Sequence, residues 1–166
     1  MIEELQATLK RLLADPDDLF HIHVRARIGK KATDVYERKV KEFILYMPSV
    51  VSRIDRLVLR EREGSDAHRL AKYLLIYLYD PEDFLPEKDN GLFGYLDDAY
   101  FVAIVYLVIL EKTPTALRTR EDEKMKEWIF EHLSSVRYLI PDESAKIEKT
   151  ISDIVTNQVL CYPVTV

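Results

Sequence analysis

The sequence predicts an all-α fold, a compact single domain of about six to eight helices. Apolar residues recur every three to four positions along most of the chain, which is the period of amphipathic helices. Only 4 glycines occur in 166 residues, where average composition would give roughly twelve, so turns and phosphate-binding loops that need glycine are rare. No linker rich in serine, glycine or proline divides the chain, so residues 1–166 are expected to form one helical domain.

The N-terminal region contains one clear helix and one ambiguous segment. Residues 2–13 have leucines at helical spacing. The run Asp15-Pro16-Asp17-Asp18 is typical of a helix start, with an acceptor side chain before a proline. Residues 20–28 nevertheless alternate apolar and polar positions, which is the period of a half-buried strand. We favour helix for 20–28, because the only β-like run that could pair with it is residues 159–166.

The next region is expected to form two helices. Asp34 and Glu37 have the spacing of a capping box and open a helix with an apolar face. Pro48 is expected to end that helix, because proline lacks the N–H that an interior position donates. Ser49 would then cap a second helix that ends by Gly64.

The middle of the chain is its most apolar part. A helix that starts at Ser65 or Asp66 becomes apolar almost all round towards its end, which predicts a position inside the core. After the connection 80–94, residues 95–112 form the most apolar helix of the sequence. We therefore expect segments 70–79 and 95–112 to pack as a central apolar helical hairpin.

Two further helices complete the domain. Thr113-Pro114 is expected to begin a helical region whose apolar residues, including Trp128 and Ile129, share one face. Pro141-Asp142-Glu143 starts a last helix, because proline suits the first helical position and acids favour the positive end of the helix dipole.

Composition limits the class of protein. With 24 basic and 29 acidic residues the net charge is −5, which disfavours general nucleic-acid binding. The single cysteine excludes an internal disulfide framework and fits a reducing compartment. The acidic N-terminus does not match a secretory signal, and the apolar stretch 99–110 is shorter than the ~20 residues of a membrane span. We expect a soluble cytoplasmic protein, and the scarcity of Asn and Gln beside abundant Glu, Lys and Arg suggests a thermophilic source.

Residues 70–112 carry the most specific motif of the chain. After an apolar helix come Pro81, Asp83, Pro86 and Glu87, and after a short loop come Gly94, Tyr95, Asp97 and Asp98. This segment resembles the YkvA-like family, helical domains of unknown function with the motif P-x-D-[LF]-[IL]-P-[DE] followed by G-Y-x-D-D and a second apolar helix. The resemblance implies a helical hairpin, no established enzymatic activity, and in some relatives an association with membranes. Here Lys88-Asp89-Asn90 replaces an apolar stretch of the family pattern, which argues against a membrane-facing loop.

The motif carboxylates suggest three roles. If the hairpin closes tightly, Asp83, Glu87, Asp97 and Asp98 would converge. We favour capping of helix ends and binding of loop N–H groups by these side chains. The alternatives are a Mg²⁺ or Ca²⁺ site, because both ions take oxygen ligands, and a general acid–base pair. We expect no metal and no cofactor.

These observations favour a non-catalytic helical interaction module, acting as an adaptor or as a self-associating subunit. The expected partners are a protein, a second copy of the chain or a membrane surface, whereas nucleic acid is not expected. The alternative is a Mg²⁺- or Ca²⁺-dependent hydrolase that uses the four motif carboxylates. A third hypothesis is weak nucleic-acid binding through the basic segment 25–41. His21 and His23 would share a face only on a strand, and no third zinc ligand is evident nearby.

Overall fold

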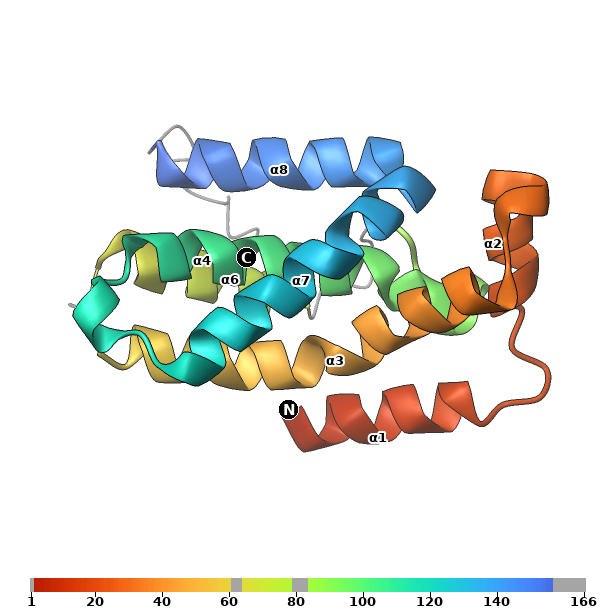
Figure 1. Ribbon diagram of the computed structural model, residues 1–166, viewed down its shortest axis with the longest axis horizontal. Coiled ribbons are helices and arrows are strands. Elements are labelled where there is room, and N and C mark those ends of the chain that lie inside the picture. Colours follow the sequence, from red (N-terminus) through yellow and green to blue (C-terminus); the bar gives the residue numbers. More distant parts are fainter. Residues whose placement is uncertain (1, 61–63, 79–83, 157–166) are drawn as a thin grey trace, which may run out of the picture.

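The computed structural model describes residues 2–60, 64–78 and 84–156 (Figure 1). Its helices are α1 (Ile2–Leu13), α2 (Phe20–Ile28), α3 (Asp34–Val58), α4 (Asp66–Tyr77), α5 (Glu87–Asn90), α6 (Leu96–Lys112), α7 (Arg120–Leu139) and α8 (Pro141–Val155). Short 3₁₀ turns occur at Gly29–Lys31, Gly91–Tyr95 and Thr115–Leu117. These ranges contain no strand, so the predicted all-α fold is confirmed, with seven longer helices and the single-turn α5.

Helix α6 is the centre of the bundle and is buried along most of its length. Helices α3, α4, α7 and α8 pack around it, while α1 lies along α3 and α2 lies at one end of the molecule (Figure 1). Helix α4 packs on α6, as expected. Helix α3 also packs on α6, and more extensively than α4 does. By length and hydropathy alone, Lys88–Lys112 resembles a membrane span, yet most of this stretch is buried within the fold.

Helix α3 differs from the prediction because it continues through Pro48. The helix loses one backbone hydrogen bond there, but its apolar face is buried on both sides of the proline, from Val40 to Leu57. Burial of that continuous face favours one helix over two, since tertiary packing supplies most helical stability. The helix begins at a different cap, because Thr33 Oγ1 accepts the backbone N–H of Tyr36 at 3.2 Å.

The predicted helix start at residues 15–18 is wrong. Asp15 Oδ1 accepts the N–H of Asp17 at 2.9 Å, and Asp18 Oδ1 accepts the N–H of Phe20 at 2.9 Å, so both side chains form local turns. The following segment is helical, as favoured, because Phe20 and Val24 lie one turn apart and are both buried. The β-like run 159–166 lies outside the described residues.

The later helix starts agree with the sequence in two of three cases. Ser65 Oγ accepts the N–H of His68, and Pro141 occupies the first turn of α8. Helix α7 starts later than the expected Thr113-Pro114, after Thr119, whose side chain forms a capping box with Asp122.

Helix α4 is less buried than its composition predicts. Leu75 and Ile76, near its C-terminal end, are 37% and 50% exposed, whereas Leu74 is 1% exposed, so this end lies against the core on one face only. The apolar face of α4 is wider than the surface that α6 and α8 cover, which leaves part of it open.

Candidate functional site

The first half of the sequence motif is only partly described. Pro81 and Asp83 lie outside the described residues, and Glu87 is described only as the first residue of α5. The carbonyl oxygen of Pro86 accepts the backbone N–H of Asn90 at 3.2 Å and its side-chain amide at 2.9 Å. Pro86 therefore shapes the single turn of α5.

The turn before α6 is anchored to the N-terminal region. Asp18 Oδ2 accepts the N–H of Leu92 at 2.9 Å. Gly91 adopts a positive φ of 57°, and a Cβ atom there would lie 2.6 Å from Asp18 Oδ2. The close approach of Asp18 therefore requires glycine at position 91, whereas Gly94 and Tyr95 lie within the 3₁₀ turn Gly91–Tyr95.

Asp97 and Asp98 lie in the first turn of α6 and are 0% and 2% exposed. Asp97 Oδ2 accepts the hydroxyl of Tyr77 at 2.8 Å, which joins α4 to α6. We expected backbone N–H groups as partners, and this contact instead uses a tyrosine. Within the described ranges, no three His, Cys, Asp or Glu side chains are placed to hold a metal ion.

A second polar centre joins α3, α6 and α7, and sequence reasoning missed it. Asp122 is 0% exposed, and its carboxylate accepts Nε and Nη2 of Arg53 and the N–H of Thr119 at 2.7 Å. The Tyr106 hydroxyl donates to the Asp122 backbone carbonyl at 3.2 Å. Burial by itself would raise the pKa of Asp122, but Arg53 and Thr119 outweigh it and lower this pKa to about 2. All of these contacts join residues of the protein to one another, so we assign Asp122 and Arg53 a structural role.

A wide groove opens between the end of α3 and α4, with a volume of about 770 Å³. Its apolar lining consists of Val58, Leu59, Ala71 and Leu75. We call it the α3–α4 groove. Leu59 is 84% exposed, the highest value among the large hydrophobic side chains of the described residues.

The α4 wall of the groove has regular helical spacing. The residues His68, Ala71, Lys72 and Leu75 follow the pattern i, i+3, i+4 and i+7, which places them on one face of the helix. Ala71 is the smallest of them and lies mid-way along that face. The sequence contains the same pattern, but the high apolar content of α4 predicts burial rather than an open face.

The polar lining of the groove is mainly basic. It comprises Asp55, His68, Arg69 and Lys72. Burial raises the pKa of Asp55. Arg69 is paired with Asp66, while Lys72 has no carboxylate within 4.0 Å in the described part of the chain. Lys72 is therefore available to pair with an acidic group on a bound partner.

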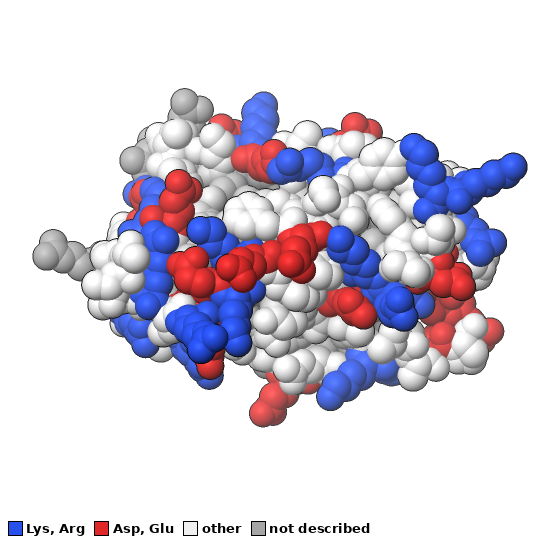
Figure 2. All heavy atoms as spheres, in the orientation of Figure 1, with Lys and Arg blue, Asp and Glu red and all other residues white. Residues whose placement is uncertain are grey.

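The basic segment 25–41 is partly engaged in contacts within the fold. Arg27 Nη2 lies 3.0 Å from Glu143, and Lys31 Nζ donates to the Tyr138 hydroxyl at 2.8 Å. Figure 2 shows that basic and acidic side chains are interspersed over the face of the molecule seen in Figure 1. The helical α2 also removes the strand geometry that would have paired His21 with His23.

The chain matches no family model, no curated protein and no solved structure in comparisons with known proteins. The similarity to the YkvA-like family thus stays a prediction from the motif residues.

Proposed function

We propose that this protein is a non-catalytic interaction module that binds an amphipathic helix of a partner protein in the α3–α4 groove. The observation that carries the proposal is the combination of an open apolar lining with helical spacing along α4. Two antiparallel helices form a channel into which a third helix can lay its apolar face. Ala71 allows the backbone of such a helix to approach closely.

Charge selects the kind of partner. Arg69 is already paired with Asp66, so Lys72 is the cation of the groove that has no carboxylate partner among the described residues. Acidic residues beside the apolar stripe of the bound helix would be complementary to Lys72. A symmetric dimer through the same groove would bring these basic residues towards their own copies, which is unfavourable. A membrane surface fits less well, because a flat bilayer cannot fill a concave groove.

The groove can be tested with a synthetic probe. The probe is an 18-residue amphipathic peptide with leucines at helical spacing and glutamates beside them, and its matched control replaces each glutamate by lysine. We expect the acidic peptide to bind more tightly than the basic one by at least tenfold in calorimetric titration. The Leu59→Glu variant is expected to abolish this binding, because it places a charge in the apolar channel.

The control variant is Val35→Glu on the same helix. Val35 is 64% exposed and lies near the opposite end of α3, about 35 Å away at 1.5 Å per residue. Equal binding of the two peptides, or equal loss of binding in the Leu59 and Val35 variants, would refute the proposal. A dimer in sedimentation experiments that Leu59→Glu dissociates would also refute it, because the occupant would then be a second copy.

A further inference from the structure

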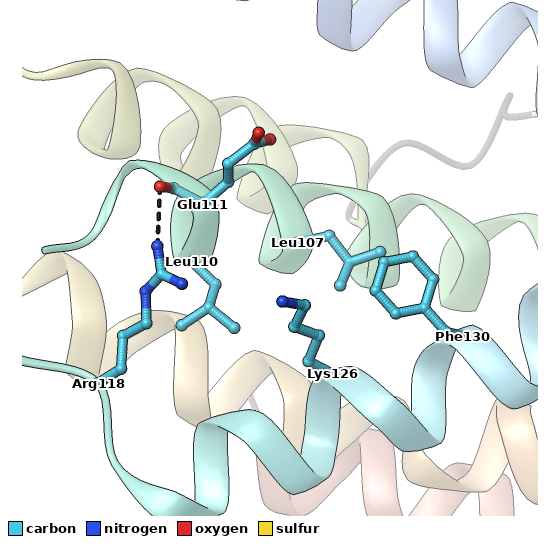
Figure 3. Close-up of a pocket in the computed structure, with 6 residues that line it drawn as sticks. All are labelled: Leu107, Leu110, Glu111, Arg118, Lys126 and Phe130. Atoms are coloured by element: carbon cyan, nitrogen blue, oxygen red, sulfur yellow. Dashed lines mark hydrogen bonds between the residues drawn. The ribbon is translucent and has the colours of Figure 1, made fainter. Parts of the chain in front are cut away.

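A separate, smaller cavity opens between the end of α6 and α7, with a volume of about 260 Å³. Its lining consists of Leu107, Leu110, Glu111, Arg118, Lys126 and Phe130 (Figure 3). Leu110 is 1% exposed and lies at the base of the cavity, whereas the Phe130 side chain is 54% exposed. The cavity therefore combines an apolar base with an open aromatic wall.

Arg118 is held rigidly at one end of the cavity. Its Nε donates to the Thr113 carbonyl at 2.9 Å, and its Nη2 donates to the Glu111 carbonyl at 3.0 Å, so it caps the last turn of α6. The remaining nitrogen, Nη1, lies 3.9 Å from Glu123, beyond hydrogen-bond distance. The N–H groups of Arg118 Nη1 can therefore donate to a bound ligand from a fixed position.

Lys126 supplies a second cation. Its Nζ is 3.9 Å from Glu123 and makes no hydrogen bond to the described residues. Figure 3 shows the Lys126 side chain extending between Leu110 and Phe130, while the Glu111 carboxylate points away from these groups. Two cations therefore face the cavity, and each lies 3.9 Å from the Glu123 carboxylate.

We propose that this cavity binds a small carboxylate with an apolar, preferably aromatic, body. The carboxylate would accept from Lys126 and Arg118 Nη1, and the body would lie over Leu107 and Leu110 against the Phe130 ring. At ~30 Å³ per water, the volume holds about nine waters, which corresponds to a ligand of roughly ten non-hydrogen atoms. The inference does not depend on the α3–α4 groove, because the two sites share no residue.

The probe is phenylacetate, measured by shifts of backbone amide signals in ¹⁵N-labelled protein. A ligand of this size is expected to bind with a Kd in the millimolar range. Signals of Leu110 and Phe130 should shift. Phenylacetamide, which lacks the charge, and acetate, which lacks the ring, should each bind at least about tenfold more weakly.

The matched variants are Lys126→Met and Lys124→Met. Methionine retains much of the apolar stem and removes the charge, and Lys124 is exposed on the same helix without lining the cavity. We expect Lys126→Met to weaken phenylacetate binding about tenfold and Lys124→Met to leave it unchanged. Equal effects of the two variants, equal binding of phenylacetate and phenylacetamide, or shifts confined to other regions would overturn the assignment.

Discussion

Replacement of Asp122 by asparagine tests the buried ion pair that joins α3 to α7. The exchange preserves the shape of the side chain but removes the buried counter-charge of Arg53, whose side chain is 11% exposed. Loss of one member of a buried pair costs about 3 kcal/mol, because the remaining charge stays desolvated. For a domain of this length the melting temperature should fall by about 6–12 °C.

The effect should depend on pH in a defined direction. The pKa of Asp122 is lowered to about 2, below the ~3.9 of an unfolded aspartate. The pair therefore contributes its full stability above about pH 5, and this contribution, about 2.6 kcal/mol, is lost progressively as the pH falls from about 5 towards about 1. Between pH 7 and pH 3, roughly half of it, about 1.3 kcal/mol, should disappear from the wild type and not from Asp122→Asn.

Urea unfolding of both proteins at pH 7 and pH 3 measures this difference. Glu121→Gln is the matched control, because Glu121 also contacts Arg53, at 3.4 Å, but is 80% exposed. Its loss should cost less than about 0.5 kcal/mol. A wild-type advantage over Asp122→Asn that is the same at both pH values would refute the reasoning, as would an equally large cost for Glu121→Gln.

Two further predictions concern the region before α6. Gly91→Ala should destabilise the protein by at least about 1 kcal/mol, because Gly91 has a φ of 57° and an added Cβ would lie 2.6 Å from Asp18 Oδ2. An unchanged midpoint in urea unfolding would contradict this. Tyr77→Phe should cost about 1–3 kcal/mol, because the buried Asp97 carboxylate loses a donor, whereas the half-exposed Tyr138→Phe should cost less than about 0.5 kcal/mol. Similar melting temperatures for the two tyrosine variants would contradict the second prediction.

The sequence by itself determined the fold class and most helix positions. Local chemistry specifies these features, as at Ser65, whose hydroxyl caps α4, and at Pro141, which occupies the first turn of α8. The high apolar content of residues 95–112 likewise predicts that α6 lies in the core, because a helix that is apolar on all sides must be covered. Local patterns failed where packing outweighed them, as at Pro48, which lies inside a helix that the core holds together.

Only the tertiary structure decided which surfaces remain open. The sequence does not indicate how much of the apolar end of α4 is covered by α6 and α8. It therefore predicts Leu75 in the core, whereas Leu75 lines the α3–α4 groove. The ion pair between Arg53 and Asp122 could not be predicted from the sequence either, because the two residues are 69 positions apart in the chain. Helical periodicity specifies which face of a helix is apolar, but the neighbours that cover that face are chosen by contacts between segments distant in sequence.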